Sequence, residues 1–120
     1  MGAIKAVRAV IDTNVMISAL LLGGTPGRLV PLWKTGRINA FASKEIVDEY
    51  MRVLTYPRFN LTEKEIEYLL YHEIVPYFEL TSTKPGLIII KRDPSEDKFI
   101  LCAEASGSQI IISGDDTFWH

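Results

Sequence analysis

Cysteine and histidine are scarce in this chain of 120 residues, which has one cysteine and two histidines. The single thiol, Cys102, excludes an intramolecular disulfide, so the sequence gives no sign of an oxidising compartment. Its place in a helix-like apolar pattern predicts a small buried thiol. Zinc prefers clusters of histidine and cysteine, and His72 and His120 are isolated, so no zinc site is expected.

A strong net charge and a long apolar run are also missing. The net charge is −2, which argues against nucleic-acid binding through overall charge but is compatible with a local basic rim. The apolar stretch from Val15 to Leu22 follows basic residues, as in a signal peptide, but it is far too short to span a bilayer. Asp12 and Asn14 also lie at its start. A cytoplasmic protein without a membrane partner is therefore expected.

Apolar residues, by contrast, are plentiful, because 48% of the chain is hydrophobic. A chain of this length can bury about two thirds of its unfolded surface in one compact domain. No internal repeat, low-complexity segment or long linker interrupts it. One domain over residues 1–120 is expected.

Hydrophobic periodicity alternates between strands and helices along the chain. Strands are expected at residues 5–11, 38–42, 87–90 and 109–113. Helices are expected at residues 14–22, 25–35, 44–56, 63–77 and 94–106. This alternation predicts a mostly parallel sheet covered on both faces, with its ligand site beyond the carboxyl ends of the strands.

Helix caps support these boundaries. Thr25 is expected to cap the second helix, with a bend at Pro31. Ser43 is a natural cap for the third helix, and Thr62 with Glu65 forms a capping box for the fourth. Glycines at positions 36 and 107 are expected to end helices.

Acidic residues occur at the boundaries of these elements. Asp12 and Asp115 directly follow strands, Glu96 and Asp97 lie in the first turn of the last helix, and Glu49 lies on the third helix. Carboxylates that converge from several elements repel one another unless a cation lies between them. Hard oxygen ligands suit Mg²⁺ or Mn²⁺, so the sequence predicts a divalent metal site.

Asp12 and Glu49 each have a structural alternative. Asp12 can cap the following helix through backbone N–H groups, a role compatible with metal binding. Glu49 resembles part of a solvated helix face with an Asp48–Arg52 ion pair, although its place between two apolar positions puts it at the edge of the buried stripe. Taken alone, Glu49 is interpreted as a surface residue.

The acids near residue 96 and Asp115 have alternatives as well. Asp93 as a helix cap and Glu96 at the third helical position would make a reciprocal capping arrangement that needs no metal and leaves Asp97 without a structural task. The spacing to Phe99, however, aligns Glu96 with the buried face, so the residues do not decide between the two acids. Asp115 in a Gly-Asp pair can be a turn residue.

Four motifs follow one another in the order VIDTNVMISAL at 10–20, SKEIVDEYMRVL at 43–54, RDPSEDKFI at 92–100 and IISGD at 111–115. Together they resemble the PIN domain, and most closely the branch of toxins of type II toxin–antitoxin pairs. The resemblance covers nearly the whole chain, and the four motifs in this order are far more specific than any one of them.

The resemblance implies a three-layer α/β/α sandwich whose acidic pocket binds Mg²⁺ or Mn²⁺ and hydrolyses phosphodiester bonds, usually in single-stranded RNA. Asp12, Glu49 and Asp115 match the first, second and fourth acids of the family. The third acid usually ends an Asp-Pro-x-Asp motif, and here Glu96 takes that position with Asp97 beside it. All five acids are therefore candidate metal ligands and catalytic residues.

Other candidate site residues surround these acids. Thr13 and Asn14 match the polar pair that steadies the family's pocket, and Ser113 precedes the last acid motif. Because the pocket is negative, RNA is expected to be gripped by its rim. The leading rim candidates are Arg28, Arg52 and Arg92, followed by Lys34, Arg37, Arg58 and Lys91. Tyr56, Phe59 and Trp33 can stack on bases, although a core role is the commoner use of an aromatic side chain.

The chain departs from its relatives near the C-terminus. It stops five residues after Asp115, whereas PIN domains of this branch usually continue through another short strand. A tail of that kind would cover a sheet edge, so a homodimer, strand exchange or an antitoxin partner is expected to stabilise the domain.

Two other functions are compatible with parts of the pattern. A degenerate PIN-fold module that binds RNA or a protein without cleaving is motivated by Glu96 and the short C-terminus. A receiver-like phosphoacceptor domain also gathers acids at a sheet rim, but it needs a lysine after the last strand, where this chain has Ser113 and Gly114. The phosphoacceptor hypothesis ranks last.

Overall fold

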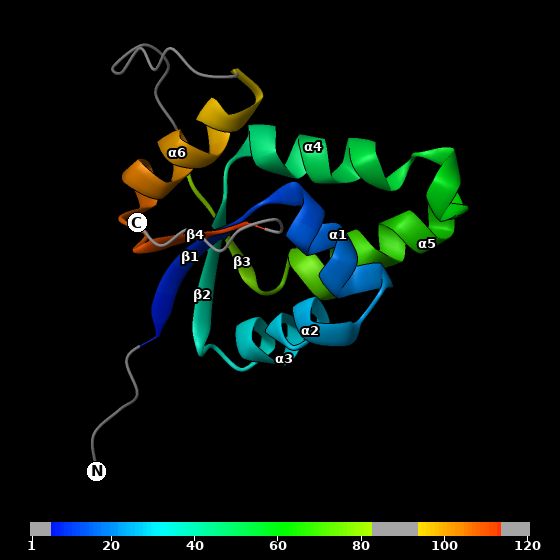
Figure 1. The fold of residues 1–120 in the computed structure, drawn as a ribbon, viewed down its shortest axis with the longest axis horizontal. Coiled ribbons are helices and arrows are strands. Elements are labelled where there is room, and N and C mark those ends of the chain that lie inside the picture. Colours follow the sequence, from blue (N-terminus) through cyan, green and yellow to red (C-terminus); the bar gives the residue numbers. More distant parts are fainter. Residues whose placement is uncertain (1–5, 83–93, 114–120) are drawn as a thin grey trace.

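Four parallel strands form one sheet in the order β3-β2-β1-β4 (Figure 1). The computed structural model describes residues 6–82 and 94–113. Its strands are β1 (Val7–Ile11), β2 (Ile38–Ala42), β3 (Phe78–Leu80) and β4 (Ile110–Ile112). In the register of the sheet, Ala9 of β1 lies opposite Ala40 of β2 and Ile110 of β4. The predicted parallel sheet is confirmed.

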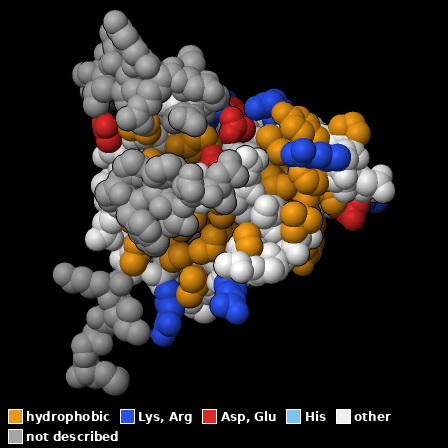
Figure 2. Space-filling model, viewed as in Figure 1, with side chains coloured by type: hydrophobic (Ala, Val, Ile, Leu, Met, Phe, Trp, Pro, Cys, Tyr) orange, Lys and Arg blue, Asp and Glu red, His pale blue; other side chains and the backbone are white. Residues whose placement is uncertain are grey.

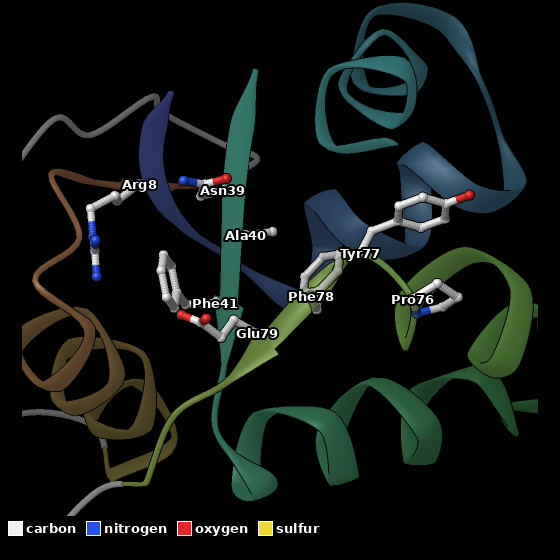
Figure 3. Close-up of a pocket in the computed structure, with 8 residues that line it drawn as sticks. All are labelled: Arg8, Asn39, Ala40, Phe41, Pro76, Tyr77, Phe78 and Glu79. Atoms are coloured by element: carbon white, nitrogen blue, oxygen red, sulfur yellow. The ribbon is translucent and has the colours of Figure 1, made fainter. Parts of the chain in front are cut away.

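Helices cover both faces of this sheet. They are α1 (Thr13–Leu21), α2 (Gly24–Gly27), α3 (Leu29–Lys34), α4 (Lys44–Leu54), the 3₁₀ turn η1 (Pro57–Phe59), α5 (Glu63–Tyr68), the π-helical η2 (Leu69–Ile74) and α6 (Pro94–Ser106). The steps β1 to β2 and β2 to β3 move in one direction across the sheet, and the step to β4 reverses. Right-handed crossovers therefore put α6 on the opposite face from α1, α3 and α4, as Figure 3 shows.

The core lies around the first two strands. Ala9, Val10 and Ile11 have no exposed surface, which requires cover on both faces of the sheet. Trp33 and Tyr50 are the largest fully buried side chains, and both rings meet the Phe78 ring edge-on. The predicted three-layer α/β/α sandwich is therefore confirmed.

The predicted helix starts at α4 and α5 are confirmed. The Ser43 hydroxyl accepts a hydrogen bond from the Ile46 N–H at 3.2 Å. Thr62 and Glu65 form a complete capping box, with bonds of 2.9 and 3.1 Å. The glycines at positions 36 and 107 have positive φ angles at the ends of α3 and α6, a backbone conformation that L side chains rarely adopt.

The second expected helix is divided differently from the prediction. Instead of one helix bent at Pro31, two short helices meet at Arg28. Proline has no N–H to bond the carbonyl four residues earlier, and its ring crowds that carbonyl, so the interruption falls before Pro31. Gly23, with a φ of 69°, takes the cap position of α2, and the predicted capping role of Thr25 is wrong.

The expected helix over residues 63–77 ends early. The π-helical η2 closes it at Ile74, and the chain then turns into β3, a strand that the sequence pattern did not reveal. Tyr77, the last residue of the expected helix, is 37% exposed. β3 pairs with β2 through Phe78 opposite Ala40. The expected strand at 87–90 lies outside the described residues.

Over the described residues, no single helix has the length and apolar character needed to cross a bilayer. One bent pair, Thr13–Leu21 with Gly24–Lys34, passes by length and composition alone, with an angle of 86° between its two parts.

Candidate active site at the carboxyl end of the sheet

Asp12 stands where β1 ends and α1 begins. Its backbone N–H donates to the Ile112 carbonyl at 2.9 Å, which fixes the residue between the ends of β1 and β4. Asp12 occupies the cap position of α1, but its side chain makes no capping hydrogen bond. The cap alternative therefore lacks the bond that would define it, and the carboxylate belongs to the carboxyl edge of the sheet.

Thr13 links this edge to α4. The side chain of Thr13 is 5% exposed, and its hydroxyl donates to Oε2 of Glu49. Because Thr13 starts α1 and Glu49 lies in the middle of α4, the bond joins two helices that flank the end of β1. The neighbouring Asn14 is exposed.

Glu49 is not a solvated surface residue, because its side chain is only 13% exposed. Lys98 of α6 forms a hydrogen-bonded ion pair with Oε1 of Glu49, and Nη2 of Arg52 lies 3.7 Å from the same oxygen. The predicted Asp48–Arg52 pair is wrong: Asp48 pairs with Lys44 at 3.1 Å. Three helices, α1, α4 and α6, thus converge on one carboxylate.

These contacts keep the Glu49 carboxylate ionised although it is partly buried. Burial alone would raise its pKa, but the hydrogen bonds from Lys98 and Thr13 and the positive charges of Lys98 and Arg52 outweigh that effect. The pKa of Glu49 is therefore lowered, and the carboxylate is ionised at neutral pH. An ionised, partly desolvated carboxylate is a suitable ligand for a hard cation.

Tyr50 links α4 to the end of β1. Its side chain is fully buried, and its hydroxyl donates to the Ile11 carbonyl, the last of β1. Burial raises the pKa of Tyr50 well above its usual range, and electrostatic interactions with Cys102, Asp12 and Glu49 raise it further. The hydroxyl therefore keeps its proton and donates it in the hydrogen bond to the carbonyl that precedes Asp12.

The remaining candidates are only partly described. Asp97 is partly buried, and within the described part of the chain its Oδ1 is shielded from solvent without a hydrogen-bond partner. Ser113 follows β4 and is partly buried, and Arg28 is exposed between α2 and α3. The side chain of Glu96 and the residues Asp93, Lys91, Arg92 and Asp115 lie outside the described residues. Trp33 is a core residue and is not available for base stacking.

The side chains at this edge fit a hard divalent cation by their chemistry. Asp12 and Glu49 supply carboxylate oxygens, and the shielded oxygen of Asp97 is the kind of orphaned acceptor that an ion satisfies. Among residues 6–82 and 97–113, no three acidic, histidine or cysteine side chains are close enough to hold an ion together. A complete ligand set would therefore draw on Glu96 or Asp115 as well.

A cleft of about 430 Å³ lies elsewhere, on the strands. Figure 3 shows its lining, with Arg8, Phe41 and Glu79 at one end and Pro76 and Tyr77 at the other. Arg8 is held by two hydrogen bonds to the Ser106 carbonyl and lies over the Phe41 ring. None of the candidate acids that the structure describes lines this cleft.

Lys98 is the site residue that sequence reasoning missed. The sequence carries only a local signal: Lys98 directly follows Glu96 and Asp97, and it is one turn of helix before Cys102, which is buried. Only the approach of α6 to α4 brings its ammonium group to Glu49.

α/β domains with a parallel sheet commonly bind their ligands beyond the carboxyl ends of the strands, where Asp12 lies in this chain. The chain belongs to the PIN domain family, whose model matches residues 8–117. This is a nuclease-type fold, whose members are usually hydrolases and generally use divalent metals. No curated protein and no solved structure matches the chain.

Proposed function

We propose that the chain is a metal-dependent endoribonuclease that hydrolyses phosphodiester bonds in single-stranded RNA. One observation carries the proposal: the ionised carboxylate of Glu49 is held by Thr13, Lys98 and Arg52 beside the strand end that carries Asp12. Family membership supplies the nuclease class, and this convergence supplies residues that can do its chemistry.

Asp12 and Glu49 would hold Mg²⁺ or Mn²⁺, together with Asp115 and either Glu96 or Asp97. When bound, such an ion supplies charge neutralisation at the phosphate and lowers the pKa of a water molecule. The acids themselves remain ionised and need not transfer protons.

The surrounding residues position these acids. The Thr13 hydroxyl fixes the orientation of the Glu49 carboxylate, and the Tyr50 hydroxyl fixes the carbonyl that precedes Asp12. Lys98 and Arg52 reduce the negative charge of the site, so that a polyanionic strand meets less repulsion there.

The test is cleavage of a fluorescently labelled, unstructured RNA by the purified full chain with Mn²⁺, Mg²⁺ or EDTA. Asp12→Asn is expected to abolish cleavage, and EDTA is expected to do the same. Asp48→Asn is the matched control, because it is the same substitution on the exposed surface of α4. Among the described residues, the carboxylate of Asp48 forms an ion pair with Lys44. Equal cleavage by Asp12→Asn and Asp48→Asn would overturn the proposal.

A non-catalytic PIN module is the second candidate, and one observation favours it. Both oxygens of Glu49 are already engaged, one by Thr13 and one by Lys98, so a cation must compete for this carboxylate. Binding of RNA by the wild-type chain without cleavage at any Mn²⁺ concentration would select this candidate.

We include in the proposal that the chain is the toxin of a toxin–antitoxin pair and forms a homodimer, on the family resemblance alone. Co-purification with the product of an adjacent gene tests the antitoxin. Light scattering coupled to size-exclusion chromatography tests the dimer, and a single monomer mass at micromolar concentration would contradict it.

A further inference from the structure

The segment that follows Glu49 carries aromatic and basic side chains without any acid. Residues 50–62 contain Arg52, Arg58, Tyr56 and Phe59, and the next carboxylate is Glu63. Figure 2 shows basic side chains lying over hydrophobic ones at the corner where α4 meets η1. We refer to Arg52, Tyr56, Arg58 and Phe59 as the arginine–aromatic platform.

Contacts within the platform hold its side chains in place. The Arg58 guanidinium lies over the Phe59 ring at 4.8 Å and over the Tyr56 ring at 5.9 Å. Nη1 of Arg52 donates to the Tyr56 hydroxyl at 2.8 Å. Such cation–π contacts restrain the guanidinium against the rings, and a guanidinium plane is a surface on which an unpaired base can stack.

The backbone under the platform is also fixed. Pro57 starts the 3₁₀ turn η1, and the Phe59 N–H bonds the Tyr56 carbonyl at 3.0 Å. Phe59 packs beside buried residues of α1, α4 and α5, including Ile17 and Leu54. Phe59 therefore anchors the platform to the core, while Tyr56 is 37% exposed and the Arg52 side chain is 60% exposed.

The platform is continuous with the candidate active site. Arg52 touches Glu49 on one side and Tyr56 on the other, so one guanidinium bridges the acid and the aromatic ring. At the rise of a helix, the seven residues from Glu49 to Tyr56 span roughly 10 Å, although α4 itself ends at Leu54. That length corresponds to about three nucleotides at a stacked spacing of about 3.4 Å. An RNA strand with its scissile phosphate at Glu49 would then reach the platform with its third base.

We propose that the arginine–aromatic platform binds the unpaired nucleotides that flank the cleaved bond, with one base stacked on the outer face of Arg58. This inference rests on the proposed function for its substrate. Two positive charges and two aromatic rings match a phosphate backbone with exposed bases. A carboxylate-free surface of this kind has no feature that selects a basic protein partner.

The test measures binding apart from cleavage. A fluorescein-labelled oligouridine of twelve nucleotides is titrated with the full chain in EDTA and followed by fluorescence anisotropy. Arg58→Lys keeps the charge but loses the planar guanidinium, and it is expected to weaken binding about five- to tenfold, as for loss of one stacked base. Arg8→Lys is the matched control, because it removes a guanidinium from the Phe41 ring in the cleft on the strands, which is lined by none of the described candidate acids.

Length dependence sharpens the test. A dinucleotide is too short to reach from Glu49 to the platform, so its affinity is expected to be the same for wild type and Arg58→Lys. Tyr56→Ala is a second variant, expected to weaken binding of the twelve-nucleotide strand but not of the dinucleotide. Circular dichroism and the melting temperature check that each variant folds.

The outcomes separate this inference from the proposed function. Equal affinities for Arg58→Lys and Arg8→Lys, or no binding of the twelve-nucleotide strand by wild type, would overturn the platform. Weakened binding by Arg58→Lys without cleavage in Mn²⁺ leaves the platform standing and removes the nuclease proposal. RNA cleavage by wild type in Mn²⁺, together with an unchanged affinity in Arg58→Lys, would leave the nuclease proposal standing and remove the platform.

Discussion

Two lysine–glutamate pairs stand at different places in the molecule, and they have different surroundings. Lys98–Glu49 joins α6 to α4 at the carboxyl edge of the sheet, with side chains 21% and 13% exposed. Lys34–Glu73 joins α3 to η2, with side chains 34% and 20% exposed. The pairs are alike in residue type and similar in burial.

Their neighbours differ in charge. Around Glu49 lie Thr13, Arg52 and, through Tyr50, the charge of Asp12. Around Glu73 the Trp33 indole donates to the backbone carbonyl at 3.1 Å, and Lys34 lies over the Tyr77 ring. The second pair has aromatic neighbours and acts as a clamp between helices. A shared pair type therefore does not indicate shared function; the groups around it do.

The largest expected effect contrasts the two glutamates in the RNA cleavage assay. Glu49→Gln is expected to lower the rate by about a hundredfold or more, since loss of an outer partner of a metal site alone costs about 10–100-fold. Glu73→Gln makes the same chemical change in the other pair and is expected to leave the rate unchanged. Equal losses in the two variants would mean that both act through stability, and the comparison would fail.

Tyr50→Phe is expected to lower the stability of the fold where α4 packs against the end of β1. The variant removes the hydrogen bond to the buried Ile11 carbonyl, which costs about 1–2 kcal/mol of the free energy of unfolding. Urea denaturation measures the change. Tyr71→Phe is the control, because Tyr71 is 61% exposed, and its stability is expected to match wild type. A Tyr50→Phe variant as stable as wild type would show that the hydroxyl bond contributes nothing.

Glu73→Gln is expected to lower the free energy of unfolding by about 1 kcal/mol or less, because the pair is partly exposed and screened by solvent. Thermal denaturation would show a decrease of at most about 4 °C in the melting temperature. A much larger decrease would mean that the clamp between α3 and η2 carries more of the fold than its exposure indicates.

The smallest effect is a pH dependence that belongs to Glu49. Its pKa is lower in the folded chain than in the unfolded chain, so the unfolded chain binds the proton more readily. The stabilisation is therefore present above the ordinary glutamate pKa and is lost as pH falls through the lower, folded value. The difference in unfolding free energy between wild type and Glu49→Gln should shrink from about pH 7 to about pH 3. A difference that stays constant would contradict the lowered pKa.

Local signals predicted most of the fold. Ser43 and the Thr62–Glu65 box mark their helix starts through short-range bonds that any chain with this spacing can make. The two central strands are apolar β-branched and alanine-rich segments, and their boundaries agree with the structure to within two residues. β3 was missed because three residues, Phe78–Leu80, carry no periodicity of their own and form a strand only by pairing with β2.

The site was predicted less completely. Motif order predicted Asp12 and Glu49 as site residues; the structure puts Asp12 at the end of β1 and joins Glu49 to Thr13, the residue after Asp12. Charge spacing along α4 suggested an Asp48–Arg52 pair, but the helix rotates Arg52 toward Glu49 and Tyr56 instead. Sequence spacing describes neighbours on one helix and carries no information about a third element, so Lys98 could not be matched to Glu49.

The sequence by itself determined the parallel α/β architecture, the family and the acid at the end of β1, because periodicity, caps and motif order are local properties. The tertiary structure alone decided the burial of Glu49 and the partners of its carboxylate. Lys98 lies 49 residues further along the chain and Thr13 lies 36 residues before. Packing of α1, α4 and α6 at one edge buries a carboxylate that looked solvated and supplies the partners that keep it ionised there, since burial and pairing depend on what surrounds a residue in space.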